Sequence, residues 1–223
     1  MRSLLLLIPA CLVSGLLMSG QTAPAPKAPA PAKAPAAKAN YKEIGSQSAT
    51  VSFEAYTDYE CPHCGVFFRD IMPQIMAQYV QTGKVKFIHR DFPLTQMHPH
   101  AQMAARYANA AGQLGFYELA VNQIFKTQDA WSLYGKNSGD IDGELVKVLP
   151  PGAMQKIREM VKVNDPKLDE SIKKDVEMGM RTDNVNGTPT VVIVKNGKRD
   201  VVPNAAQLPF SIWKSYLDKV LSN

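Results

Sequence analysis

Two cysteines separated by two residues are the side chains in this sequence best suited to chemistry. Cys61 and Cys64 enclose Pro62 and His63. A pair at this spacing can close and reopen a disulfide, and the thiolate is the reactive form. If Cys61 begins a helix, the unpaired N–H groups and partial positive charge of the helix end favour its thiolate. The imidazole of His63 can add to this effect, and a more stable thiolate makes a more oxidising disulfide.

Two other uses of the cysteine pair stay open at this point. A structural zinc ion needs four ligands, and the histidines that could complete such a set are His63, His89, His98 and His100. His98 and His100 flank a proline at a predicted helix start, where we expect them to cap the helix or lie on the surface. A purely structural disulfide over so short a span would stabilise the fold little. Reversible thiol chemistry is therefore the favoured interpretation.

The segments around the cysteine pair predict a strand, a helix and a second strand. Residues 48–57 have the β-branched and aromatic composition of a strand. Residues 66–80 carry apolar side chains near helical spacing, and Pro73 is expected to kink this helix. Residues 84–89 alternate apolar and polar side chains, as a half-buried strand does. The result is a βαβ unit in which Cys61 lies at the start of the helix.

The rest of the chain predicts a helical block, a β-hairpin and a last helix. Residues 98–181 are poor in strand signals, and glycine and proline divide them into helices over 99–112, 114–127, 141–149, 152–161 and 165–181. Residues 190–195 form a β-branched run, Asn196-Gly197 is typical of a hairpin turn, and 198–202 form the return strand. An amphipathic helix follows over 208–221. This order of elements indicates an α/β fold.

The first 20 residues predict an export signal. Arg2 supplies a positive charge, and the apolar stretch after it is shorter than the roughly 20 residues that a membrane-spanning helix needs. We therefore expect a cleaved signal peptide over 1–20, with no stable membrane insertion afterwards. Cleavage would remove Cys11 and leave the chain in an oxidising compartment where disulfides persist. The alternative is lipidation at Cys11, which would keep the protein tethered to a membrane.

A spacer and the distribution of charge complete the outline. Residues 21–40 are almost wholly Ala, Pro and Lys, a composition that cannot bury a core and favours an extended linker. The formal net charge of +5 comes largely from residues 1–39, which contain no acid but hold the bases Arg2, Lys27, Lys33 and Lys38. The remaining chain is nearly neutral, so we expect no nucleic-acid binding.

Three separated motifs resemble those of the DsbA-like thioredoxin-fold family of disulfide oxidoreductases. The first is Tyr56-Thr-Asp-Tyr-Glu-Cys-Pro-His-Cys64, around the cysteine pair. The second is Arg90-Asp-Phe-Pro-Leu94 followed by His98-Pro-His-Ala101. The third, Gly187-Thr-Pro-Thr190, is similar to the family's cis-proline loop. The motifs occur in the expected order, and the resemblance covers roughly residues 41–221.

The resemblance implies a thioredoxin fold with an inserted helical subdomain. Here the domain would span 41–223, with the insertion at about 98–181. The family's catalytic motif corresponds to Cys61, Pro62, His63 and Cys64, with Cys61 as the cysteine that attacks or is attacked and Cys64 as the one that resolves. No cofactor and no metal are implied.

The third motif carries the substrate-binding part of this expectation. The resemblance implies that Pro189 is cis and faces the disulfide. Such a loop leaves backbone groups free to pair with an extended peptide, so Thr188 and Pro189 are the candidate substrate-binding residues.

The function that the resemblance implies is that of a periplasmic or other extracytoplasmic dithiol oxidase, acting as a monomer. It would pass the Cys61–Cys64 disulfide to reduced or misoxidised exported proteins through a mixed disulfide. A membrane quinone-linked thiol oxidase would then reoxidise it. The alternatives are a reductase or isomerase that is kept reduced, and a non-catalytic module that binds peptides or metal.

Two departures from the family's pattern bear on the chemistry. Many relatives carry a buried Glu six residues before the first cysteine, where it accepts a proton. This chain has Ala55 there, and strand alternation would turn the neighbouring Glu54 to the opposite face. Thr188 precedes the cis-proline, as in isomerases of this fold, whereas the best-known strong oxidases have Val. We expect a less extreme redox potential than the Cys-Pro-His-Cys motif alone suggests.

Overall fold

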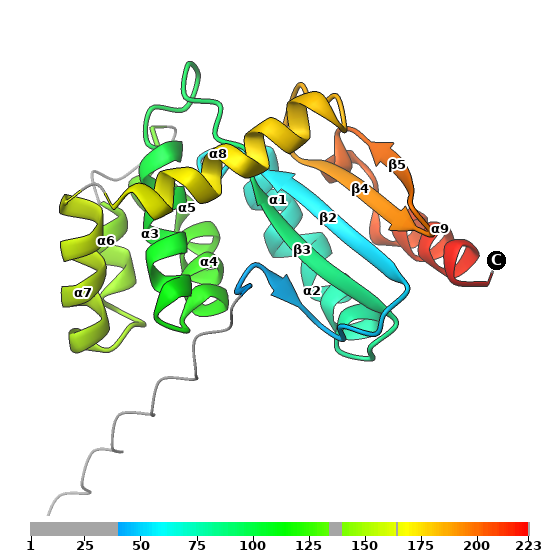
Figure 1. Ribbon diagram of the computed structural model, residues 1–223, viewed down its shortest axis with the longest axis horizontal. Helices are drawn as coiled ribbons and strands as arrows, with labels where there is room; N and C mark the ends of the chain where they lie inside the picture. The colour runs from blue at the N-terminus through cyan, green and yellow to red at the C-terminus, as the bar shows by residue number, and fades with distance from the viewer. Residues whose placement is uncertain (1–39, 134–139, 164, 223) are drawn as a thin grey trace, which may run out of the picture. The chain divides into compact units, whose positions relative to one another are not determined.

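The computed structural model describes residues 40–133, 140–163 and 165–222. Their centre is a five-stranded sheet in the order β1-β3-β2-β4-β5 (Figure 1). The strands are β1 (Glu43–Ile44), β2 (Val51–Thr57), β3 (Val85–Asp91), β4 (Thr190–Lys195) and β5 (Lys198–Val202). β2 pairs with β3 in parallel and with β4 antiparallel, and β1 and β5 are antiparallel edges. The strands that the sequence predicts are confirmed, and β1 is a short addition to them.

The helix after the first cysteine begins at Pro62, directly after Cys61 as predicted, and is irregular. It starts as α1 (Pro62–Val66), widens into a π-helical segment η1 (Phe67–Ile71), continues as α2 (Met72–Ile75) and ends in a second π-helical segment, η2 (Met76–Val80). Pro73 lies between the two wide segments and cannot donate the N–H that a regular helix uses. The helix packs on the sheet beside α9 (Phe210–Ser222), where Phe67 stacks on Phe53 near the buried Trp213.

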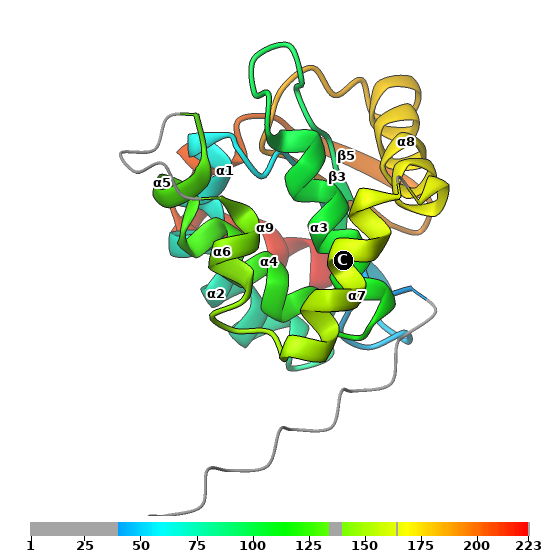
Figure 2. The same cartoon turned by 90° about the vertical axis from the view of Figure 1, so that its left-hand side faces the viewer.

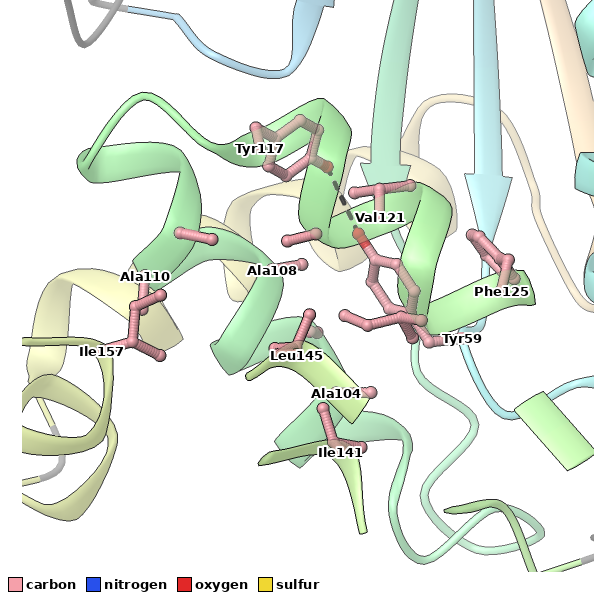
Figure 3. Close-up of a cluster of buried hydrophobic side chains, with 14 of the residues drawn as sticks. Tyr59, Ala104, Ala108, Ala110, Tyr117, Val121, Phe125, Ile141, Leu145 and Ile157 are labelled. Atoms are coloured by element: carbon pink, nitrogen blue, oxygen red, sulfur yellow. Dashed lines mark hydrogen bonds between the residues drawn. The ribbon is translucent and has the colours of Figure 1, made fainter. Parts of the chain in front are cut away.

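A block of helices joins β3 to β4, as the sequence predicts. Its members are α3 (Ala101–Gln113), α4 (Tyr117–Lys126), α5 (Gln128–Trp131), α6 (Ile141–Leu145), α7 (Pro151–Lys162) and α8 (Pro166–Arg181). The helix α3 packs against α4, α7 and α8, and Figure 2 shows these helices gathered around it. The alanines of α3, among them Ala104 and Ala108, let its neighbours approach closely and meet Tyr59 and Phe125 in one apolar core (Figure 3).

The last and longest helix of this block, α8, crosses the face of the sheet opposite to α1 and α2 (Figure 1). Val176 and Met178 of α8 pack there against Tyr56 and Val192 of the central strands. Both faces of the sheet are therefore covered, which explains why β2 is buried along almost its whole length.

The predicted signal peptide over 1–20, with Cys11, and almost all of the predicted linker over 21–40 lie outside the described residues. Within the part of the chain that the structure describes, no helix is both long enough and apolar enough to cross a bilayer.

Candidate active site

Cys61 lies at the point where β2 gives way to α1. It is the N-cap residue of α1, and Pro62 occupies the first turn, where its missing N–H would have had no partner. The backbone of Cys61 is held on both sides, because its N–H donates to the carbonyl of Asp58 at 3.2 Å and its carbonyl accepts from Gly65 N at 3.1 Å. Gln128 of α5 adds a side-chain donor to the same carbonyl at 2.9 Å. The position of this cysteine is thus fixed by its own helix and by the insertion.

The sulfur of Cys61 is set up to exist as a thiolate. Its pKa is lowered from 9.0 to about 5, first by a hydrogen bond from the Cys64 thiol and then by the backbone N–H of Cys64, the side chain of Thr188 and the backbone N–H of His63. Burial works against this shift. In the thiol form, Cys61 Sγ donates to the carbonyl of Thr188 across 3.6 Å. The local donors therefore outweigh desolvation at this sulfur.

Cys64 has the opposite character. It is fully buried, while Cys61 retains 6% exposure, and both cysteines are free thiols. Burial raises the pKa of Cys64 well above its usual range, and the hydrogen bond that it donates to Cys61 raises it further. The N–H of Asp58 donates to Cys64 Sγ at 3.4 Å. One sulfur is thus near the surface and easily ionised, and the other is enclosed and keeps its proton.

The predicted cis-proline loop lies against this pair. The Thr188–Pro189 peptide bond is cis, as the resemblance implies. Thr190 Oγ1 donates to the carbonyl of Gly187 at 2.8 Å and closes the turn that precedes β4. A small hollow of about 40 Å³ separates the loop from α1 and is lined by His63, Thr188, Pro189, Asn204, Ala206 and Gln207. The structure therefore brings all the residues predicted for the site together, with His63 exposed on its rim.

Glu54 and Ala55 point to opposite faces of the sheet, as strand alternation predicts. Ala55 is buried in the core that includes Phe53 and Phe67, on the side of the active-site helix. Glu54 is buried on the α8 side, where it accepts hydrogen bonds from Arg90 at 2.9 Å and Arg199 at 3.2 Å. The Glu54 carboxylate thus binds two guanidinium groups, on the face of the sheet opposite to the active-site helix.

His89 is a buried residue near the site that sequence analysis did not single out for this role. It lies on β3 directly beside Ala55, with no exposed surface. Its Nε2 is hydrogen-bonded to Thr57 Oγ1 and its Nδ1 to the hydroxyl of Tyr117 at 2.9 Å. Burial, followed by the charge of Lys42, lowers the pKa of His89 to about 3. A neutral imidazole therefore lies beside Ala55 on the sheet, and its ring contacts Phe68 of the active-site helix.

Of the two histidines in the His98-Pro99-His100 segment, His100 meets the expectation of capping or surface placement, as the exposed N-cap residue of α3, and His98 does not. His98 is buried, and its Nδ1 lies 2.7 Å from Asp58 Oδ2. His100 is half exposed, and its Nδ1 lies 2.9 Å from Glu60 Oε1. The acids of the first motif thus pair with the histidines of the second, which explains why the two motifs occur together. An acid and a histidine about 40 residues apart give no local signal, so sequence periodicity could not reveal this pairing.

Metal ligation was one of the alternatives for the cysteine pair. Among the described residues, no group of three or more His, Cys, Asp or Glu side chains has the geometry to hold a metal ion.

Comparisons with known proteins fit this geometry. The family model described as Thioredoxin matches residues 39–208. The Na(+)/H(+) antiporter NhaA 3 of Salinispora tropica is 40% identical over 76 residues, which are 34% of this chain and 11% of the antiporter. Disulfide bond formation protein D of Bacillus subtilis is 26% identical over 159 residues, 67% of this chain and 66% of that protein. This chain therefore spans only part of the length of these curated relatives.

Among solved structures, alpha-DsbA1 of Wolbachia pipientis superimposes with a TM-score of 0.63 at 23% sequence identity, covering 81% of this chain and 90% of that one. At this identity the likeness establishes the thioredoxin fold with its helical insertion. The family match extends across all three motifs, from the segment before β1 to η3 (Ala205–Gln207). The chain therefore belongs to the thioredoxin family, and its fold is similar to that of alpha-DsbA1.

Proposed function

We propose that this protein is a thiol–disulfide oxidoreductase, and that it acts as a dithiol oxidase on exported proteins. The observation that carries the proposal is the contrast between the two sulfurs. The pKa of Cys61 is lowered to about 5, and that of Cys64 is raised well above its usual range. A disulfide between two such groups has one sulfur that leaves readily as a thiolate, which favours transfer of the disulfide to a substrate.

The proposed reaction starts from the Cys61–Cys64 disulfide. A substrate thiolate attacks Cys61 Sγ, the Cys61–Cys64 bond breaks, and the bonding pair passes to Cys64, which takes up a proton. A second substrate thiolate then attacks the substrate sulfur of the mixed disulfide and releases Cys61 as a thiolate. The substrate gains one disulfide and loses two electrons, and the enzyme is left with two reduced cysteines. The low pKa of Cys61 makes it the better leaving group in this second step.

The neighbouring residues have supporting roles in this proposal. Pro62 fixes the start of α1 beneath Cys61. The loop of Thr188 and Pro189 lies against Cys61 Sγ and would pair with the backbone of an extended substrate. His63, on the rim of the hollow, would add a donor to the thiolate.

Partners and location are part of the same proposal. The protein would be exported by residues 1–20, or tethered to the membrane through Cys11, and would meet reduced or misoxidised proteins as a monomer. A membrane quinone-linked thiol oxidase would return its disulfide. The relative in Bacillus subtilis is named for disulfide bond formation, which supports this direction of transfer.

The test is a comparison of cysteine variants on a reduced, unfolded substrate protein. The oxidised enzyme should accelerate disulfide formation. Cys64→Ala, first charged at Cys61 as a mixed disulfide with nitrothiobenzoate, should exchange with a substrate thiolate and release nitrothiobenzoate. The resulting Cys61–substrate adduct, which Cys64 can no longer open by internal attack, should be released by dithiothreitol. Cys61→Ala should form no such adduct. If the double variant keeps the full activity, the protein is a binding module and the proposal is wrong.

The same substrate in scrambled form separates oxidase from isomerase. An isomerase rescues scrambled disulfides and needs a free Cys61, so it works only when it is supplied reduced. Efficient rescue by the reduced enzyme, without net oxidation by the disulfide form, would replace the oxidase proposal with the isomerase one.

A further inference from the structure

A buried carboxylate lies at the centre of the active-site turn. Asp58 has no exposed surface and is three residues before Cys61. Its Oδ1 accepts hydrogen bonds from Glu60 N at 2.7 Å and from Cys61 N at 3.2 Å. One oxygen of this carboxylate therefore shapes the whole turn that delivers Cys61 to α1.

The other oxygen of the carboxylate is held by a distant part of the chain. Asp58 Oδ2 accepts from Leu94 N at 2.7 Å and lies 2.7 Å from His98 Nδ1. Leu94 and His98 belong to the loop between β3 and α3, which leads into the helical insertion. Burial raises the pKa of Asp58, and the donors from Leu94 and His98 act against that shift. With four donors around it, the carboxylate clamps the active-site turn to this loop.

The clamp also affects Cys64, because the backbone N–H of Asp58 contacts the Cys64 sulfur. Asp58 N–H points at Cys64 Sγ across 3.4 Å. This contact is one of the few that lower the pKa of Cys64 against the large effect of burial. A fixed N–H aimed at an atom where negative charge develops stabilises the transition state, and it acts most strongly in a site shielded from water.

We propose that Asp58 is a positioning residue for Cys64: its carboxylate, clamped by Leu94 and His98, keeps the Asp58 N–H on the buried sulfur while that sulfur carries charge. This inference rests on the proposed thiol–disulfide exchange. When a substrate thiolate opens the disulfide, Cys64 leaves with the bonding pair. In the reverse step, Cys64 loses its proton and attacks Cys61, and the substrate leaves as a thiolate. Both directions pass through the same charged sulfur, so the N–H assists both.

The chain contains a matched control for this role. Glu60 is another fully buried acid of the same turn, and it clamps a second histidine. Its Oε1 accepts from Leu133 N at 2.6 Å and lies 2.9 Å from His100 Nδ1, and its Oε2 accepts from His100 N at 2.6 Å. The chemistry is the same as at Asp58, but the contact with Cys64 Sγ comes from Asp58 alone of these two residues. A change at Glu60 therefore measures the general effect of disturbing the turn.

The experiment follows the reduced protein as it reacts with dithiobis(nitrobenzoate), an aromatic disulfide that supplies the oxidising equivalents. Cys61 attacks first and releases one nitrothiobenzoate. Cys64 then attacks the mixed disulfide, closes the Cys61–Cys64 bond and releases a second nitrothiobenzoate. The first phase therefore reports on Cys61 and the second on Cys64, within a single trace.

In Asp58→Asn, an N–H₂ group replaces one carboxylate oxygen. This group is itself a donor, so it cannot accept the hydrogen bonds that the oxygen received. We expect the second phase to be about tenfold slower, less than for the loss of an oxyanion-hole donor, because the N–H is displaced and not removed. The first phase should slow by much less than the second, because the asparagine oxygen can still accept from Glu60 N and Cys61 N. Glu60→Gln should leave the ratio of the two phases unchanged.

His98 provides a second test that does not depend on the folding of the Asp58 variant. His98→Leu should slow the second phase, and His98→Asn should restore it, because the asparagine N–H₂ group can take the place of Nδ1 as a donor. An unchanged second phase in Asp58→Asn and His98→Leu overturns the proposal, and so does an equal slowing in Glu60→Gln. If the native protein releases only one nitrothiobenzoate, the proposed exchange itself fails, which is a separate result.

Discussion

The two faces of the central sheet carry opposite kinds of chemistry. On the face covered by the active-site helix, Phe53, Ala55 and Phe87 form an apolar floor, and the buried imidazole of His89 beside it is neutral. On the face covered by α8, Glu54 is held between two arginines. Adjacent residues of one strand thus face two environments, Ala55 the apolar core and Glu54 the arginines. The pKa of Cys61 is lowered by hydrogen bonds from the Cys64 thiol and from nearby donors.

The charged face is a connected network. Arg90 pairs with Glu54 and with Asp175 of α8, and Arg199 of β5 pairs with Glu54 and Asp183. Each acid in it is nearly or fully buried, so each depends on its partners for compensation. This network joins the sheet to the insertion without involving the cysteines. We therefore expect a change at Glu54 to leave the pKa of Cys61 unaffected.

The largest expected effect is the separation of the two thiols in pH. Alkylation of Cys61 by iodoacetamide should follow a midpoint near pH 5, where the ordinary value is 9.0. Below that pH the thiol is protonated and its reactivity falls; above it the thiolate reacts at a constant rate. Cys64 should stay unreactive throughout, because it is fully buried. A midpoint near the ordinary value, or faster labelling of Cys64, would contradict the contrast on which the proposed function rests.

We expect the ion-pair network on the α8 face to contribute more to the free energy of unfolding than the redox face does. Glu54→Gln removes the negative charge that pairs with both Arg90 and Arg199. This change should lower the free energy of unfolding by about 3 kcal/mol. Chemical denaturation measures this free energy of unfolding. The exposed pair of Glu170 and Lys174 provides the control, and Glu170→Gln should cause no measurable change. The alkylation midpoint of Cys61 should be the same in both variants, and a shift in Glu54→Gln would disprove the independence of the two faces.

The sequence predicts the local features of this molecule better than its long-range contacts. The alternation of Glu54 and Ala55, the βαβ unit and the cis-proline loop were predictable, because each depends on residues close in the chain or on a recognised motif. The histidine partners of Asp58 and Glu60 were not, since they come from the distant segment before α3. The π-helical segments around Pro73 were not predictable either, because helical spacing alone does not distinguish a π from an α turn.

The redox face should be sensitive to added volume. A methyl group at Gly65 would lie 2.2 Å from Gln128 Oε1, and Gln128 is fixed by hydrogen bonds to the carbonyls of Tyr59 and Cys61. Gly65→Ala should therefore destabilise the protein by about 1–3 kcal/mol. At Gly152 of α7 the same methyl group meets nothing within 4 Å, so Gly152→Ala should stabilise it by about 0.5–1 kcal/mol. Equal effects at both positions would refute the close packing of Gln128 on α1.

His89 should make the redox face sensitive to acid. Its pKa is lowered from 6.5 to about 3 in the folded protein, so folding favours the neutral imidazole. Its contribution to stability is complete above pH 6.5 and is lost as the pH falls toward 3, by about 1 kcal/mol between pH 7 and 5.5. In His89→Gln this part of the pH dependence should disappear, whatever the variant's stability at pH 7. If the free energy of unfolding depends on pH in the same way in His89→Gln and in the native protein, His89 is protonated in the folded state.

The smallest expected effect is that of His63, at the exposed end of the redox face. Its backbone N–H is among the groups that lower the pKa of Cys61, and this donor survives in His63→Ala. Only the contribution of the imidazole is lost, so the disulfide should become less oxidising by about threefold in its equilibrium with glutathione, where tenfold corresponds to about 30 mV. Gln207 lines the same hollow, and Gln207→Ala should leave that equilibrium unchanged. A more oxidising His63→Ala protein would show that the imidazole stabilises the disulfide and not the thiolate.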